Sequence, residues 1–356
     1  MRIFLLLLHI LLFGHLLNII MPSHAYDDIH FFRPIFFFGE PHLERPGLCN
    51  LTAYGSHGTH IAHRPHHFSC QPNPIPQATV SLTEIAILWS QNSIRGFFVS
   101  GYIPIRSFSV TNQQYSATTH QICSIARAQH QTFTTPPSSA NYVRTGVGDV
   151  AIAAGWTINY EETRIIDFID GTIQCGITLP TSTHPEPNYL FDIPLGYQGH
   201  TGYFIIGDAS LGLFDWLTFG AHLQVIGFSP RFAYEQATTF QYTKKPGMGV
   251  TVGTFCKADH VILGLSVTAA YSFTHKGQDT ALPCIPSSSG LPIPQFCDTA
   301  WSMHAIHIIV DYDFATYKNP YAPRMGFIWN KGFRGRHSVP FSLLGGLWDM
   351  SAVWVF

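Results

Sequence analysis

Residues 146–162 read GVGDVAIAAGWTINYEE, and their side chains alternate in size and polarity with a period of two. The large apolar residues share one face: Val150, Ile152, Ala154, Trp156, Ile158 and Tyr160. The other face is small or polar: Asp149, Ala151, Ala153, Gly155, Thr157 and Asn159. A period of two indicates a β-strand. A soluble β-sandwich carries Lys and Glu on its solvent-exposed face. A face of large apolar residues opposed by a face of small residues is instead typical of strands that contact lipid.

The same alternation recurs along the chain. It is clear in four further segments, at 168–179, 216–227, 263–274 and 302–314. With weaker segments included, it predicts twelve strands, at 48–56, 81–91, 95–106, 147–160, 165–179, 203–213, 216–228, 248–258, 262–274, 302–315, 322–331 and 341–356. Because a bilayer satisfies no backbone hydrogen bonds, strands cross it only as a closed barrel. We therefore predict an all-β fold, an antiparallel transmembrane β-barrel of twelve strands.

The connections between these predicted strands alternate in length. Short ones lie at 92–94, 161–164, 214–215, 259–261 and 316–321. Long ones lie at 57–80, 107–146, 180–202, 229–247 and 275–301, and an intermediate one, 332–340, is on the same side. Bacterial barrels have short periplasmic turns, long extracellular loops and an even number of strands. The pattern therefore predicts that both ends of the barrel chain lie in the periplasm.

The composition also favours contact with lipid. Charged residues make up 11% of the 356 residues, less than half of the roughly one-quarter that is usual in soluble domains. Hydrophobic residues reach 46% and aromatic residues 14%, which excludes an intrinsically disordered chain. The formal net charge of −2 offers no basic surface for nucleic acid. A secreted soluble β-sandwich is the alternative fold.

The first 46 residues predict export. Arg2 precedes an apolar run of 18 residues, which the small-residue site at Ala25 follows, so residues 1–25 are predicted to be a cleaved signal peptide. A run of this length also reaches the lower limit of a membrane-spanning helix, so an uncleaved anchor is the alternative. Residues 26–46 are expected to form a periplasmic N-terminal segment, a partial plug of the lumen or an extra strand. Residues 47–356 are the predicted barrel domain.

The last segment, FSLLGGLWDMSAVWVF at 341–356, alternates toward one face and ends on Phe356. It resembles the terminal strand of bacterial outer-membrane β-barrel proteins, the porin-like superfamily, without matching one characterised family. The resemblance implies a place in the bacterial outer membrane among its lipids. It also implies that the barrel-assembly machinery reads Phe356 as an assembly signal.

Charged and imidazole side chains are predicted to line the lumen. Alternation places the following residues on the inner face: Glu84, Arg106, Asp149, Asp170, Asp208, His222, Lys257, His307, Asp311, Asp313, Arg324 and Asp349. The acids outnumber the Lys and Arg residues in this set, and lumen charge sets ion selectivity in pores. An open lumen is therefore expected to prefer cations weakly. The alternative is that these acids and bases pair across the lumen and close it.

A histidine cluster suggests a metal site in the first long connection. SHGTHIAHRPHHFSC contains His57, His60, His63, His66 and His67. Neutral imidazole is a common ligand of zinc and also suits copper and nickel. The spacing matches no standard zinc signature, so the alternative is that these residues only replace Lys on the surface. No cofactor is otherwise expected.

The seven cysteines offer two candidate disulfides on the side of the long loops. Cys284 and Cys297 bracket the segment PCIPSSSGLPIPQFC, and a bond between them would restrain that loop. Cys70 and Cys123 lie in two other long connections and form the second candidate pair. Spacing does not establish connectivity. Cys175 and Cys256 lie on predicted strands, where free thiols are expected.

These features favour an outer-membrane channel through which small solutes pass passively. One alternative is a structural, adhesin-like barrel with a closed lumen, whose long loops meet a host or neighbouring cell. Another is a barrel hydrolase, which requires a nucleophile beside a His and a residue that orients the imidazole. The adjacent pair His337 and Ser338 falls in a loop, without such a partner in the motif, so we expect no enzyme activity.

Overall fold

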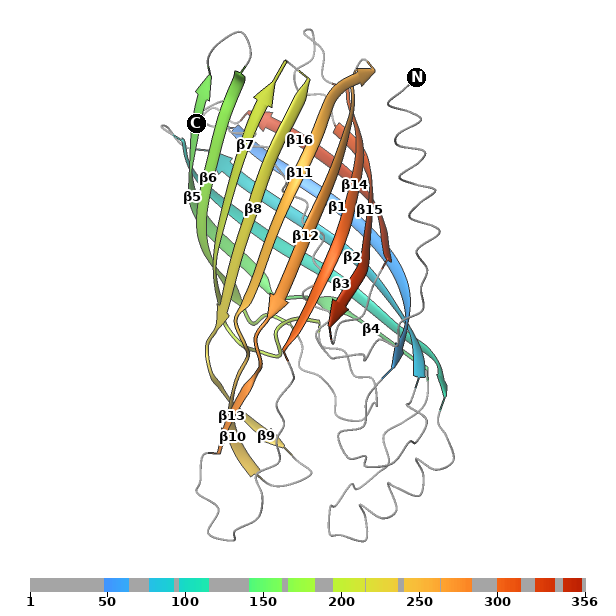
Figure 1. Ribbon diagram of the computed structural model, residues 1–356. Coiled ribbons are helices and arrows are strands. Elements are labelled where there is room, and N and C mark those ends of the chain that lie inside the picture. The colour runs from blue at the N-terminus through green and yellow to red at the C-terminus, as the bar shows by residue number, and fades with distance from the viewer. Residues whose placement is uncertain are drawn as a thin grey trace.

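The computed structural model describes residues 48–63, 77–92, 96–114, 141–161, 166–182, 195–214, 216–235, 240–262, 264–283, 300–314, 324–336 and 342–353. These residues form a barrel of tilted strands with a small sheet beyond one end (Figure 1). Within them, no helix is long and apolar enough to cross a membrane. The predicted signal peptide, the segment 26–46 and Phe356 lie outside the described residues.

The barrel wall is built from long strands, each antiparallel to its neighbours. They are β1 (Leu48–His63), β2 (Gln77–Asn92), β3 (Phe97–Gln114), β4 (Tyr142–Val147), β5 (Val150–Glu161), β6 (Ile166–Leu179), β7 (Gly202–Leu213), β8 (Leu217–Phe228), β11 (Gly249–Ile262), β12 (Leu265–Lys276), β14 (Trp301–Asp313), β15 (Arg324–Arg336) and β16 (Ser342–Val353). Both β4 and β5 pair with β3, so they share one position in the wall.

The pairings return on themselves. The order runs from β2 through β1 and β16 around to β5 and β3, and β2 also pairs with β3. The wall therefore has twelve strand positions, and every described wall strand except β4, which pairs with β3 alone, has a neighbour on both sides. This confirms the prediction of an antiparallel β-barrel of twelve strands. All twelve predicted segments coincide with a wall position.

The predicted ends of several strands were wrong. The largest errors lie toward the long loops, and at the opposite end β11 continues to Ile262 instead of ending at residue 258. β1 continues to His63 instead of ending at residue 56, β3 continues to Gln114, and β15 continues to Arg336. His57, His60 and His63 are therefore on β1 and not in the loop to which they were assigned. Alternation of apolar residues is needed only where lipid covers the wall, whereas the backbone ladder can extend beyond it.

A second, three-stranded sheet was not predicted. It contains β9 (Arg231–Glu235), β10 (Phe240–Lys245) and β13 (Thr280–Pro283), in the order β13, β10, β9. These strands arise from the long connections that follow β8 and β12, and they project beyond the barrel at the end where the long connections gather (Figure 1). We call this end the long-loop end and the opposite one the short-turn end.

The two faces of the wall have the predicted character. Ile152, Ile158 and Ile173 are 46%, 66% and 57% exposed on the outer face, whereas Ala151 and Ala153, on either side of Ile152 along β5, are buried. Exposed aromatic rings lie near both ends of the outer wall, including Tyr203 and Tyr312. An apolar outer surface with aromatic residues at its margins matches the lipid-facing band of membrane barrels.

A charge placed in the apolar band should destabilise the barrel according to its depth. Ile173 lies in the middle of β6, whereas Val143 lies on β4 near the long-loop end. Ile173→Lys is expected to lower the free energy of unfolding by about 2–4 kcal/mol, and Val143→Lys by about 0–1 kcal/mol. Urea unfolding of both variants in lipid vesicles measures the difference. Equal effects at the two positions would contradict the assignment of the outer face.

Candidate functional site

The candidate site is the inside of the barrel. Of the predicted inward residues, seven are buried: Glu84, Arg106, Asp149, Asp170, His222, His307 and Asp311. Asp208 and Lys257 are partly buried. Asp313 is exposed at the end of β14. Arg324 is the register partner of both Asp313 and Asp349, which places the last three predicted residues in one row of the wall.

Aromatic rings inside the barrel lie against glycines of the neighbouring strand. Phe98, Phe204 and Phe255 are buried, and their direct register partners are Gly155, Gly176 and Gly220. A Cβ added to any of these glycines would lie 2.0–2.4 Å from the partner ring. The missing side chains therefore let the rings pack close to the wall, which leaves the centre of the lumen to other groups.

Hydrogen-bonded polar side chains form a belt around the middle of the inner wall. His222 Nδ1 lies 2.6 Å from Asp208 Oδ1, between β7 and β8. On β12, β14 and β15, His307 Nε2 lies 2.7 Å from Ser272 Oγ, and His307 Nδ1 lies 2.9 Å from Asn330 Oδ1. Asn330 Nδ2 has no hydrogen-bond partner among the described residues. We call these five residues the polar belt.

Ser272, His307 and Asn330 are arranged like a catalytic triad, in which a base contacts a nucleophile on one side and an orienting group on the other. However, catalysis by such a triad also needs donors aimed at a developing oxyanion and space for a substrate. The backbone around Ser272 is engaged in ladders with β11 and β14, and the three side chains are only 2–4% exposed. The contacts of His307 with Ser272 and Asn330 therefore join three neighbouring strands through buried side chains.

An ion pair anchors a connecting segment inside the long-loop end. Arg106 Nε donates to Glu84 Oε2 at 2.5 Å, and Tyr102 donates its hydroxyl proton to Glu84 Oε1 at 2.9 Å. Arg106 Nη1 donates to the backbone carbonyl of Leu195 at 2.8 Å. Leu195 is fully buried. The ion pair of β2 and β3 thus holds the start of segment 195–201, which we call the plug segment.

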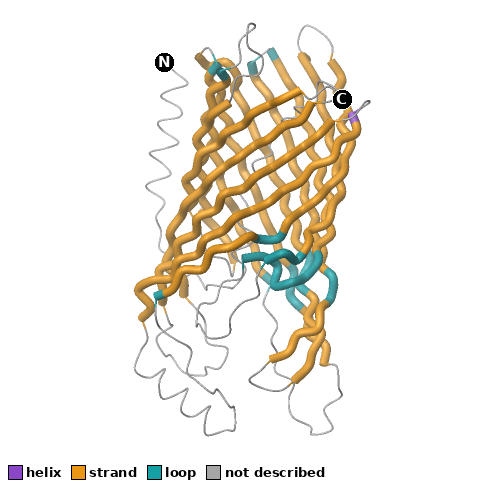
Figure 2. The backbone as a smooth tube through the Cα atoms, turned by 180° about the vertical axis from the view of Figure 1, so that it is seen from behind, coloured by secondary structure: helices purple, strands orange, loops and turns teal. Residues whose placement is uncertain are grey.

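Asp149 is the second anchor of the plug segment. It lies between β4 and β5, where its carboxylate accepts the backbone N–H of Ser182 at 3.1 Å and of Tyr197 at 2.5 Å. A Cβ on Gly196 would lie 2.4 Å from this carboxylate, so the close approach needs glycine. The Tyr197 ring packs on Phe228 with centroids 4.7 Å apart. The described loops gather at this end of the barrel (Figure 2).

The small sheet holds the turn of the plug segment. Gln198 and Gly199 have positive φ values of 53° and 82°, and His200 donates its N–H to the carbonyl of Tyr197. A non-glycine residue is strained in this conformation unless its surroundings hold it. Arg231 donates to the Gln198 carbonyl at 2.8 Å, and Lys244 donates to Gln198 Oε1 at 3.3 Å.

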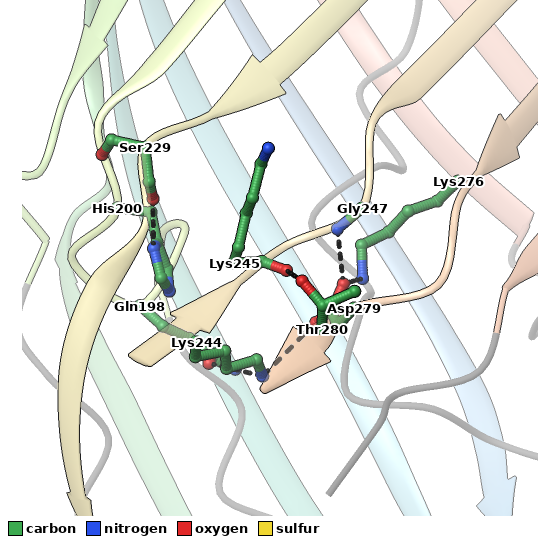
Figure 3. Close-up of polar contacts among 9 residues, drawn as sticks. All are labelled: Gln198, His200, Ser229, Lys244, Lys245, Gly247, Lys276, Asp279 and Thr280. Carbon is green, nitrogen blue, oxygen red and sulfur yellow. Dashed lines mark hydrogen bonds and ion pairs between the residues drawn. The ribbon is translucent and has the colours of Figure 1, made fainter. Parts of the chain in front are cut away.

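Asp279 connects the small sheet to the barrel wall (Figure 3). Its carboxylate accepts the Gly247 N–H at 2.7 Å and pairs with Lys276 at 2.7 Å and Lys244 at 3.4 Å. Lys276 ends β12, whereas Lys244 belongs to β10 and reaches Gln198. The plug segment, the small sheet and the wall are thus one connected structure.

His200 is a titratable group in this structure and lies outside the wall strands. Its Nδ1 is 2.9 Å from the Ser229 carbonyl, which identifies Nδ1 as the donor (Figure 3). Burial lowers the pKa of His200 below its ordinary value, and the cations of Lys244 and Arg231 lower it further. The imidazole is therefore neutral at pH 7.

Sequence reasoning missed several of these residues. Lys276 is two residues beyond Thr274 and therefore faces inward like the other even-numbered residues of β12, but the predicted strand ended at residue 274. The plug segment and Asp279 fell within predicted loops, and no periodic pattern marks them.

Near the short-turn end, Asp259 pairs with Lys257 at 2.9 Å and accepts a hydrogen bond from the Ser266 hydroxyl at 2.8 Å.

The metal and disulfide predictions remain open. Among the described residues, no group of three or more His, Cys, Asp or Glu side chains could hold a metal ion. His66 and His67 lie outside the described residues, so the proposed cluster stays a prediction. The four candidate disulfide residues also lie outside them: Cys70, Cys123, Cys284 and Cys297. Cys175 and Cys256 carry free thiols, as expected for strand positions.

Comparison with known proteins supports the fold. No protein-family model and no curated protein sequence matches the chain. The structure resembles an outer-membrane channel from Pseudomonas putida F1, with a TM-score of 0.59 and 10% identity over 90% of this chain and 99% of that one. The β domain of the Bordetella autotransporter BrkA gives a TM-score of 0.41 and 13% identity over 85% and 98%. The first likeness shows the fold of an outer-membrane β-barrel.

Removing the anchoring cation should destabilise the barrel and release the plug segment. Arg106→Gln leaves the Glu84 carboxylate buried without the cation that it contacts, which is expected to cost about 3–5 kcal/mol of unfolding free energy. The double variant Glu84→Gln with Arg106→Gln should recover part of this loss. Denaturant unfolding in detergent micelles measures both, and an unchanged single variant would contradict the role of the pair.

Acid should loosen the plug segment through His200. Because its folded-state pKa is lowered, the neutral form stabilises the fold at pH 7, and this contribution is lost as the pH falls below about 6.5. Amide hydrogen exchange at 195–201 is therefore expected to accelerate between pH 7.5 and pH 5, relative to the intrinsic rate. His200→Gln keeps a donor for Ser229 and should suppress the change, whereas His275→Gln on the outer wall should not.

Proposed function

We propose that this protein is a passive channel for small polar solutes in the bacterial outer membrane. The proposal rests mainly on the difference between the two faces of the barrel wall. The outer face is apolar, and the inner face holds Ser, Thr, His, Asn and Asp side chains. A wall of this kind suits lipid outside and hydrogen-bonding solutes inside. The likeness to an outer-membrane channel agrees with this proposal at the level of the fold.

The inner wall favours polar solutes over apolar ones. The polar belt presents hydroxyl, imidazole and amide groups, and further threonines line the same face, with Thr157 and Thr172 3.3 Å apart. Such groups replace part of the hydration shell of a passing solute. The inner rings of Phe98, Phe204 and Phe255 approach glycines of the neighbouring strand closely, so they reduce the polar surface less than rings that project into the lumen would.

The plug segment is the proposed gate. It is anchored by Arg106 and Asp149 at the long-loop end, and its turn is held from the small sheet by Arg231 and Lys244. Passage requires these contacts to loosen, since most charged inner residues are buried when they are formed. Loop and segment motions of this kind occur on time scales of nanoseconds to microseconds or longer.

The burial of the inner residues also favours a second candidate function. A barrel whose plug segment never opens would act as a scaffold, and the small sheet and the long loops would be its binding surface for a neighbouring or host cell. The projection of β9, β10 and β13 beyond the barrel favours this alternative (Figure 1). Electrical measurement separates the two functions, because only a channel conducts.

Planar bilayers containing the refolded protein are expected to show discrete conductance steps with weak cation preference. Asp208 contributes to the inner charge beside His222, so Asp208→Asn should shift the reversal potential toward that of a non-selective pore. Asp313→Asn, at an exposed position, should change it less because water and salt screen that charge. Absence of conductance in wild-type protein and in Arg106→Gln would favour the closed scaffold.

A further inference from the structure

Three cations of β15 lie on the outer wall at the long-loop end, beside imidazoles of β12 and β14. Antiparallel register partners share a face, which defines three outward rows: His275, Ser302 and Arg336; Phe273, His304 and Arg334; Tyr271, Ile306 and Lys331. Tyr271 and Ile306 are 39% and 38% exposed. Their chain neighbours Ser272, which follows Tyr271, and Ala305, which precedes Ile306, are buried. We call Lys331, Arg334 and Arg336, with the imidazoles of His275 and His304, the outer cation patch.

A β-bulge places the two arginines on this face. Asn330 of β15 is buried in the lumen, so continued alternation would also turn Arg334 and Arg336 inward. The register shifts beside His304, and Phe333 becomes an additional residue. Alternation is thereby reversed, and both arginines are exposed. Bulges re-aim side chains in this way, often next to functional sites.

The cations of the patch have no compensating charge on the described wall. Lys331, Arg334 and Arg336 make no ion pair or hydrogen bond with any residue that the structure describes. β12 and β15 contain no Asp or Glu, and the acids of β14, Asp311 and Asp313, lie at the opposite end. Like charges on one strand face repel, so the arrangement favours an anion supplied from outside.

The patch lies at the depth expected for lipid headgroups. Phe273, Tyr271 and Phe333 surround the His304 ring, with centroids 4.9, 6.0 and 6.1 Å from it, and form an aromatic margin beside the arginines. His304 and Tyr312 are separated by eight residues on β14, or about 27 Å along the strand. A tilt of about 40° reduces this to about 21 Å across the bilayer, close to the ~25 Å apolar band of such barrels.

The outer row that starts at Arg336 carries no Lys or Arg on the strands that follow β14 around the wall. The row that contains Arg336 and His275 continues across β11, β8 and β7 through Val250, Val225 and Ile205. These residues are apolar and carry no charge. On this side the patch therefore ends at β12.

We propose that the outer cation patch binds the phosphate groups of a phosphorylated glycolipid in the outer leaflet. Arginine pairs with phosphate through two parallel hydrogen bonds, and the aromatic margin contacts the first carbons of the acyl chains. The proposal rests on placement in the outer membrane with the long loops outward. It does not depend on conduction, so a barrel that fails to conduct still tests it.

The test uses the full mature barrel in phosphatidylcholine nanodiscs and titrates in diphosphorylated lipid A. Each lost cation is expected to weaken binding about fivefold, as for basic residues near an anionic surface. The variant with Lys331→Gln, Arg334→Gln and Arg336→Gln should therefore lose more than tenfold. Lys245→Gln removes an exposed cation of the small sheet and should bind as the wild type does.

Two further tests measure binding to the wild-type protein while the salt concentration or the phosphorylation of the lipid is changed. Binding to the wild type should weaken as NaCl is raised from 0.1 to 1 M, because salt screens exposed charges. Dephosphorylated lipid A should bind at least tenfold more weakly. Equal binding of the two lipids, insensitivity to salt, or an unaltered triple variant would each overturn the proposal. Displacement of lipid A by millimolar inorganic phosphate would also overturn it, since the patch would then be a site for free phosphate.

Discussion

The hydrogen bonds of the backbone are the constraint on which the rest of this structure depends. A lipid bilayer offers no partner for an exposed N–H or C=O group, so a sheet that enters it must have no free edge. The pairings β1–β16 and β2–β3 complete the ring and remove that edge. Once the ring is closed, alternation along each strand separates an outer face for lipid from an inner face for polar groups.

Closure creates a second problem, because polar groups inside the ring must also find partners. The structure solves it with short-range pairs across neighbouring strands, such as Glu84 with Arg106 and Asp208 with His222. It also uses a connecting segment as a source of backbone donors and acceptors. Asp149 binds the N–H of Tyr197, and Arg106 binds the carbonyl of Leu195. The charges of the lumen therefore pair with one another and also position the plug segment.

The sequence predicts those parts of the fold that lipid dictates. Alternation gives all twelve wall positions, the inner location of residues such as Asp170 and His307, and the end at which long loops gather. It fails where lipid no longer acts: the extension of β3 to Gln114 and the small sheet follow no apolar stripe. The plug segment was missed for another reason. Its anchoring contacts with Arg106 and Asp149 pass through its own backbone, so they leave no periodic pattern in the sequence.

The bulge at Phe333 shows how one wall serves two sides independently. β12, β14 and β15 supply Ser272, His307 and Asn330 to the polar belt, and within a few residues of Asn330 β15 supplies the outer cations. Without the additional residue, Arg334 would share the inner face with Asn330 and add charge to the lumen. With it, the arginines are separated from the polar belt by the thickness of the sheet. Since the two faces share no side chain, the outer arginines and the polar belt of the same three strands can vary independently of each other.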